Sequence, residues 1–280
     1  MSTTISMPPG PGTYLLIVSL PLLVISEFRS TSYVGICLFK MLSSVAFLSG
    51  PLLQASTNDS PYCRLITAGL LFSLVGDFFL LPSRGDFSTR DSTKERKISA
   101  SFQLGVVAFA AAHIAYVFAF LSDSRETSRE LLATTFVATM VLAKWLGVVY
   151  PPSHSSATSN VLDLAVAPDM RPLVFVYALI ISSMFAVAVS TLPSSLSTVL
   201  PYQRSVGAAM FVASDLFVAK DAFGRSSAPD QRGWFRIAVG YGLYFWGQMV
   251  IAGTGSIGSN KCNGKAACGL YCGPLPCLST

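Results

Sequence analysis

Long apolar stretches and short polar stretches follow one another along most of this chain. Each apolar stretch holds about 20 residues, the length that an α-helix needs to cross the hydrocarbon core of a bilayer. Backbone groups in lipid must be bonded within their own segment, so each stretch predicts a helix. We expect eight spans: Gly10–Phe28, Tyr33–Leu53, Leu65–Leu81, Ile98–Leu121, Leu131–Tyr150, Leu173–Leu192, Gln203–Phe223 and Trp234–Gly253.

The remaining residues leave no room for a soluble domain. We expect a short N-terminal segment over residues 1–9, one transmembrane helical domain over residues 10–253, and a disordered Gly/Cys-rich tail over residues 254–280. One longer loop contains Pro151, Pro152, His154 and Pro168. The first apolar stretch has the length of a signal peptide core, but residues 1–12 contain no Lys or Arg, so we interpret it as a span.

Composition supports lipid as the solvent of this chain. Hydrophobic residues make up 52% of it and charged residues 12%, about half the roughly 25% typical of soluble domains. The net charge of +5 sits in short loops rather than in a basic patch, so no nucleic-acid partner is expected. The loops on one side carry ten Lys and Arg and those on the other side six. This bias favours the richer side as cytoplasmic, with both termini outside or in a lumen.

A short internal sequence repeat indicates that the chain consists of two similar halves. Residues Val75–Leu80 of the third span and Ala213–Val218 of the seventh each place a small residue before an aspartate, with a Phe soon after. The helix after each continues the match, at Gly105, Phe109 and His113 in one half and Gly240, Tyr244 and Gln248 in the other. We infer two parallel four-helix halves, an arrangement that places sites between halves in other membrane proteins. Chance similarity between apolar helices is the alternative.

Asp77 and Asp215 are the strongest candidates for chemistry. A charged residue at mid-membrane costs about 2.5–3.5 kcal/mol, and such residues usually face a bundle interior or a wet cavity. Each aspartate lies on a stripe of small residues that lets helices approach closely. An aspartate can also be buried only for packing, but two in matching positions of the repeat favour a shared site between the halves.

Other polar residues inside the spans are candidates for a supporting role. Lys40 in the second span is a natural counter-charge for one aspartate. His113 and Tyr116 share one face of the fourth span, and Tyr244 and Gln248 share one face of the eighth. A buried histidine can simply be a bonded core residue, and amides often join helices.

Arg204, at the start of the seventh span, could bind a lipid phosphate or simply mark the membrane interface. The spans show no spacing that would bind zinc, and the tail cysteines match no strong zinc pattern. No metal and no organic cofactor is expected.

These motifs together resemble the YhhN-like lysoplasmalogenase family. The resemblance rests on Gly76-Asp77, on Gly105-x3-Phe109-x2-Ala112-His113-x2-Tyr116, on Gly207-Ala208-x2-Phe211-x2-Ser214-Asp215, on Tyr244-x3-Gln248 and on Lys40. It covers roughly Tyr33 to Ile251, and the tail and the Pro/Ser loop depart from it. It implies an eight-span fold, two catalytic aspartates, and cleavage of the vinyl ether bond of a lysoplasmalogen into a fatty aldehyde and glycerophosphocholine or glycerophosphoethanolamine.

The chemistry of a vinyl ether agrees with the residues. Vinyl ethers resist base and hydrolyse in acid, so the reaction needs one protonated carboxylic acid and a second group to activate water. Apolar surroundings and a neighbouring carboxylate both favour the neutral acid. Which aspartate plays which part stays open. A proton-coupled transporter and a non-catalytic lipid-binding protein are the alternatives. In a eukaryotic cell we expect the endomembrane system, at the endoplasmic reticulum.

Overall fold

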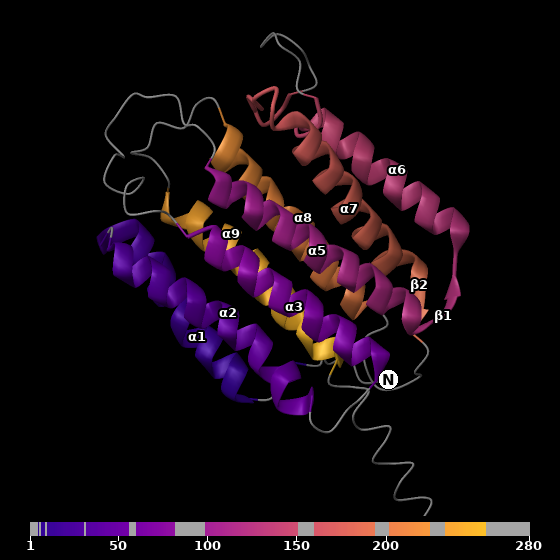
Figure 1. The fold of residues 1–280 in the computed structure, drawn as a ribbon, viewed down its shortest axis with the longest axis horizontal. Coiled ribbons are helices and arrows are strands. Elements are labelled where there is room, and N and C mark those ends of the chain that lie inside the picture. The colour runs from indigo at the N-terminus through magenta and orange to yellow at the C-terminus, as the bar shows by residue number, and fades with distance from the viewer. Residues whose placement is uncertain are drawn as a thin grey trace, which may run out of the picture.

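The computed structural model describes residues 5, 7–8, 10–30, 32–55, 60–81, 99–150, 160–193, 202–224 and 233–255. Eight α-helices in these ranges lie side by side with their axes roughly parallel (Figure 1). They are α1 (Gly10–Ile25), α2 (Tyr33–Ala55), α3 (Pro61–Phe79), α5 (Ala100–Ser122), α6 (Arg129–Trp145), α7 (Arg171–Ser190), α8 (Gln203–Phe223) and α9 (Trp234–Gly255). The predicted all-helical bundle is confirmed. The predicted terminal segment and tail lie largely outside the described residues.

Local sequence signals explain where several helices begin. The hydroxyls of Ser60, Ser99 and Ser128 accept hydrogen bonds from backbone N–H groups at the starts of α3, α5 and α6, and such caps satisfy donors that a helix leaves unpaired. Pro61 stands at the first position of α3, where its missing N–H costs nothing. A π-helical turn, η1 (Ser26–Ser30), follows α1.

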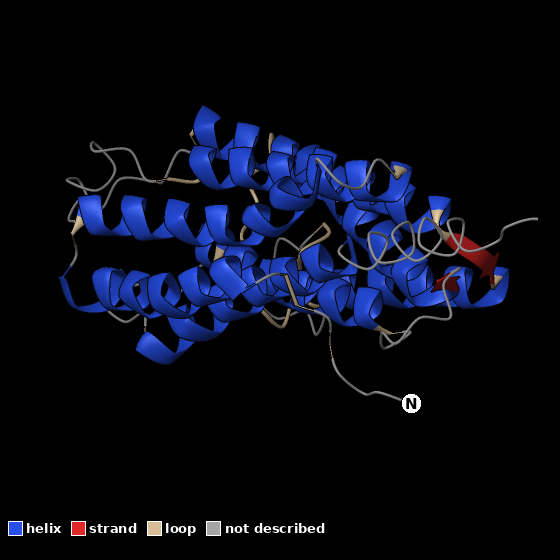
Figure 2. Cartoon of the chain, turned by 90° about the horizontal axis from the view of Figure 1, so that it is seen from below, coloured by secondary structure: helices blue, strands red, loops and turns tan. Residues whose placement is uncertain are grey.

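A small extended element closes one end of the bundle. Strand β1 (Ser124–Thr127) follows α5 and pairs in antiparallel fashion with β2 (Thr191–Pro193), which follows α7. Figure 2 shows this pair at one end of the helices. The pairing ties the end of α5 to the end of α7, two helices that also pack against each other.

The helix contacts repeat between the two halves of the chain. In the first half α1 packs on α2, α2 on α3, and α3 on α5; in the second, α6 packs on α7, α7 on α8, and α8 on α9. The second helix of each half packs on the last helix of the other, as α2 with α9 and α7 with α5. This crossed pattern is what two parallel four-helix halves predict, and it puts α5 and α9 at the centre.

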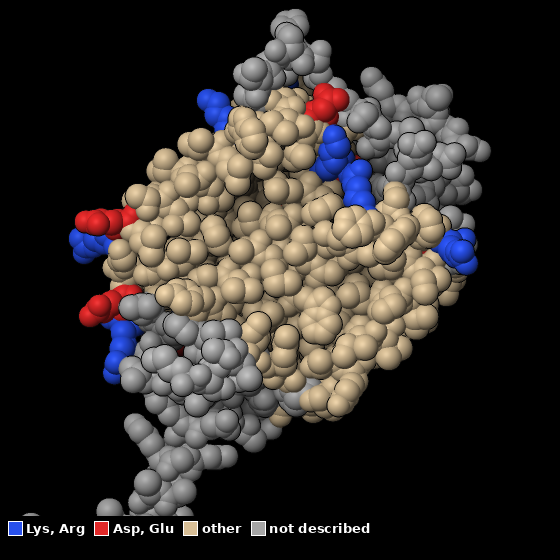
Figure 3. Space-filling model, turned by 180° about the vertical axis from the view of Figure 1, so that it is seen from behind, with Lys and Arg blue, Asp and Glu red and all other residues tan. Residues whose placement is uncertain are grey.

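The surface agrees with a multi-pass membrane protein. Five described helices are long and apolar enough to cross a bilayer by themselves: α1, extended to Arg29, together with α2, α3, α5 and α7. The face in Figure 3 is uncharged across its middle, and its Lys, Arg, Asp and Glu side chains lie toward the periphery. Helix α6 has no buried residue and lies on the outside of α7.

Glycines allow the closest helix approaches. A methyl group added at Gly69 of α3 would lie 2.3 Å from the ring of Tyr116 on α5, and one at Gly76 would lie 2.8 Å from the ring of Phe109. On the matching pair in the second half, Gly207 of α8 faces Gly247 of α9, backbone against backbone. Small residues therefore set the spacing of α3 with α5 and of α8 with α9.

Candidate functional site

Asp77 is the centre of a buried cluster formed by α2, α3 and α9. Asp77 lies in the last turn of α3 and is 2% exposed. Its Oδ2 accepts hydrogen bonds from Ser44 Oγ at 2.7 Å and Tyr244 Oη at 2.7 Å. Lys40 Nζ lies 3.8 Å from its Oδ1. Both carboxylate oxygens thus have polar partners, one of them a cation.

A second layer of polar groups continues this cluster along α3, α5 and α9. Tyr116 Oη donates to Gln248 Oε1 at 2.8 Å, and Gln248 Nε2 donates to Ser73 Oγ at 2.9 Å. All three side chains are buried. Ser73 stands one helical turn before Asp77, so the layer lies directly beside it. These bonds lock α3, α5 and α9 together on the inner side of Asp77.

Asp215 is the centre of a second cluster, formed by α5, α7 and α8. It lies near the middle of α8 and is partly exposed. Its Oδ2 accepts a hydrogen bond from Tyr177 Oη of α7 at 2.6 Å. His113 of α5 is fully buried, and its Nε2 lies 3.2 Å from the same Tyr177 oxygen. No cation among the described residues pairs with Asp215.

Aromatic rings lie between the two clusters and contact residues of both. The ring centroid of Phe211 lies 4.5 Å from that of His113 and 5.4 Å from that of Tyr244. Phe109 contacts both Phe211 and Tyr244. The aspartates therefore do not share a hydrogen-bond partner among the described residues. They form two centres with an aromatic layer between them, and the shared site expected from the sequence stays a prediction.

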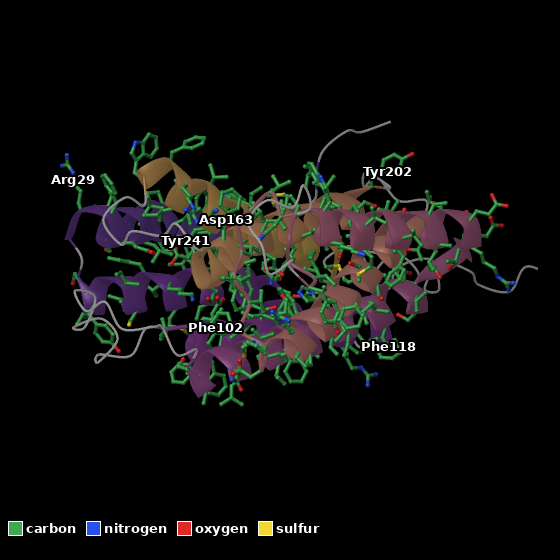
Figure 4. The ribbon with its side chains drawn as sticks, turned by 90° about the horizontal axis from the view of Figure 1, so that it is seen from above. Arg29, Phe102, Phe118, Asp163, Tyr202 and Tyr241 are labelled. Atoms are coloured by element: carbon green, nitrogen blue, oxygen red, sulfur yellow. The ribbon has the colours of Figure 1, made fainter. Side chains whose placement is uncertain are left out.

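Arg204 lies apart from both clusters, at the opposite end of the bundle. It is 5% exposed, forms an ion pair with Asp123 at the end of α5, and has its guanidinium 4.8 Å from the ring centroid of Tyr62. Eleven residues of α8 separate it from Asp215, about 16 Å along a helix axis. Figure 4 labels Arg29 and Tyr202, which lie toward the two ends of the bundle; Arg204 stands just after Tyr202.

Three partners in these clusters were not predicted from the sequence: Ser44, Ser73 and Tyr177. Nothing in the sequence marks Ser44, and Ser73 was predicted only as one of the small residues on the same helical face as Asp77. Tyr177 could have been found from the internal repeat. It stands 137 residues after Lys40, and Asp215 stands 138 residues after Asp77. Each half therefore places a polar residue of its second helix against the aspartate of its third, a lysine in one half and a tyrosine in the other.

The described residues contain no group of three or more His, Cys, Asp or Glu side chains that could hold a metal ion. What the clusters offer is acid and base chemistry. They contain two carboxyl groups, three tyrosine hydroxyls and one imidazole inside an apolar bundle.

Comparison with known families shows where this arrangement belongs. The model of the YhhN family matches residues 35–255, which include both clusters and seven of the eight helices almost completely. The chain belongs to the YhhN family. No curated protein and no solved structure matches it. This is the family that the motifs indicated, and both aspartates lie within the matched residues.

Proposed function

We propose that this YhhN protein is an intramembrane hydrolase that cleaves the vinyl ether bond of lysoplasmalogens. The observation that carries the proposal is the pair of inward-facing aspartates, each bonded to a tyrosine hydroxyl, on opposite sides of one aromatic layer. Paired carboxyl groups in unlike surroundings are how proteins supply an acid and a carboxylate at the same pH.

The reaction needs what these groups provide. A carboxylic acid donates its proton to the β-carbon of the vinyl ether, whose π electrons form the new C–H bond while the ether oxygen stabilises the cation. A carboxylate nearby stabilises that cation, as in glycoside hydrolysis. Water then adds to the α-carbon and loses a proton to a base. In the resulting hemiacetal a proton moves from the hydroxyl to the glycerol oxygen as the C–O bond breaks, which gives an aldehyde and an alcohol.

The length of the substrate indicates where its headgroup would lie. Seven bonds join the phosphorus of a lysoplasmalogen to the β-carbon of its vinyl ether, and at roughly 1.2 Å of advance per bond this spans about 8 Å. Arg204, about 16 Å along α8 from Asp215, is too distant to bind that phosphate. Lys220, five residues beyond Asp215 toward the other end, lies about 8 Å along the axis. We therefore expect the headgroup at the end of the bundle where α8 finishes, and a structural role for Arg204.

The test is release of fatty aldehyde from an alkenyl lysophospholipid by purified protein in detergent. The saturated alkyl lysophospholipid is the substrate control, because it lacks the double bond that accepts the proton. We expect Asp77→Asn and Asp215→Asn each to lower the rate by a factor of 10² or more, in line with loss of a general acid or base. Asp169→Asn makes the same change at an exposed aspartate of a loop and leaves the rate unchanged.

The outcomes separate the candidate functions. Absence of aldehyde from the wild-type protein rules out the hydrolase. Unchanged release by both aspartate variants rules out the two aspartates as its acid and base. Transport of protons or lipid across proteoliposomes without hydrolysis would support a carrier instead. For a eukaryotic host we place the enzyme at the endoplasmic reticulum, which imaging of the tagged chain would check.

A further inference from the structure

The two aspartates have unlike surroundings, and the difference assigns their roles. Asp77 is 2% exposed, accepts two hydroxyl hydrogen bonds on Oδ2, and has the ammonium of Lys40 beside Oδ1. Hydrogen bonds and an adjacent cation both stabilise a carboxylate. Asp215 has one hydroxyl donor, on Oδ2, and its Oδ1 has no partner among the described residues. Its side chain is also the more exposed of the two.

The hydrogen bonds around Tyr177 fix the state of His113. The single hydroxyl hydrogen of Tyr177 is donated to Asp215, so the same oxygen can only accept from His113. In the neutral imidazole, Nε2 of His113 therefore carries the hydrogen and Nδ1 is a bare acceptor. That Nδ1 is buried and has no hydrogen-bond partner among the described residues. A buried acceptor without a partner is a place where water or a substrate hydroxyl can bind.

We propose that Asp215, Tyr177 and His113 form a proton relay, an inference that rests on the proposed function. Asp215 is the proton donor, and Asp77 remains the ionised partner of Lys40. The free Oδ1 of Asp215 holds the proton that goes to the β-carbon, and Asp215 is left as a carboxylate. The water that attacks the α-carbon is bound at Nδ1 of His113.

The relay returns the proton in one concerted path. As the water oxygen bonds to the α-carbon, its proton passes to Nδ1 of His113. The hydrogen on Nε2 passes to the Tyr177 oxygen, and the Tyr177 hydrogen passes to Oδ2 of Asp215. One proton leaves the water and one arrives on Asp215, so the charge of the protein after addition equals its charge before reaction. Tyr177 acts as a positioning residue that links the donor to the water site.

Infrared spectroscopy of the resting protein tests this assignment without any substrate. The carbonyl stretch of a protonated aspartic acid is distinct from the bands of carboxylates and amides. Labelling the aspartate side-chain carboxyl with ¹³C moves that band and so identifies it. The measurement uses the full chain at neutral pH in a detergent without ester groups, whose carbonyl would otherwise overlap. We expect one such band in the wild-type protein.

Two matched substitutions locate the band. Tyr177→Phe removes the donor to Oδ2 of Asp215, and Tyr244→Phe removes an equivalent donor to Oδ2 of Asp77. Loss of a donor strengthens the C=O bond, so Tyr177→Phe should move the band to higher wavenumber and Tyr244→Phe should leave it in place. Asp215→Asn should remove the band, and the exposed-site variant Asp169→Asn should not.

The outcomes are decisive in both directions. A band that moves in Tyr244→Phe assigns the proton to Asp77, and a band that survives in Asp215→Asn assigns it to another aspartate. Either result overturns the proposal. A wild-type protein with no protonated aspartate overturns it as well. Because no turnover is measured, these results are independent of aldehyde release. A protein with the expected band but no hydrolysis would refute the proposed function and leave the protonation assignment standing.

Discussion

Replacement of Gly69 by alanine tests whether the close approach of α3 and α5 holds the bundle together. In most helices this change is favourable, because alanine has a higher helix propensity than glycine by about 1 kcal/mol. Here the new methyl group would lie 2.3 Å from Cε1 of Tyr116 and 2.7 Å from its Cδ1. The ring is fully buried, stacks on Phe120 and is hydrogen-bonded to Gln248, so it cannot move aside freely.

The expected cost follows from these contacts. Overpacking of a buried site costs about 1–3 kcal/mol, and loss of the hydrogen bond from Tyr116 to Gln248 costs about 0.5–1.5 kcal/mol more. After the gain in helix propensity is subtracted, Gly69→Ala should lower the free energy of unfolding by roughly 2 kcal/mol. The assay is reversible denaturant unfolding of the purified protein in detergent micelles, followed by circular dichroism.

Gly242→Ala is the matched control. Gly242 is a glycine of α9 with nothing within 4 Å of the position that a methyl group would take. This variant should be as stable as the wild-type protein or more stable, by up to about 1 kcal/mol. If Gly69→Ala proved as stable as Gly242→Ala, steric contact with the Tyr116 ring would not be what spaces these helices.

Three further outcomes are expected. Lys40→Met leaves the buried carboxylate of Asp77 without its cation and should lower the free energy of unfolding by about 3–5 kcal/mol. Adding Asp77→Asn should restore part of this loss. If the losses of the two single variants simply added in the double variant, Lys40 and Asp77 would not stabilise each other. Arg204→Gln removes a buried guanidinium that pairs with Asp123 and packs on the ring of Tyr62, so thermal stability should fall while the KM for alkenyl lysolipid stays the same. A raised KM with normal stability would place Arg204 at the substrate. In ¹⁵N-histidine NMR, with the chain's other histidine replaced, His113 should show a protonated Nε2 and an unprotonated Nδ1, and the opposite tautomer would break the relay.

The sequence by itself determined the helices and the two halves. Lipid allows no unpaired backbone groups, so apolar length alone predicts where the chain is helical, and seven of the eight predicted spans lie within four residues of the observed helices at both ends. The fifth is the exception at its far end, because α6 ends at Trp145 and the chain then turns at Gly147 with positive φ. Because charged residues are costly inside a membrane, Asp77, Asp215 and Lys40 could also be recognised from the sequence as candidate site residues.

Only the tertiary structure decided which partner each of these groups meets. Tyr244 reaches Asp77 across 167 residues and Tyr177 reaches Asp215 across 38, and such pairings depend on how each helix is rotated about its axis in the bundle. That rotation is set by many small packing contacts, including the glycine approaches, which no single stretch of sequence reveals. The same packing placed an aromatic layer between the aspartates and gave them unlike neighbours, so the two repeated motifs form two different chemical environments.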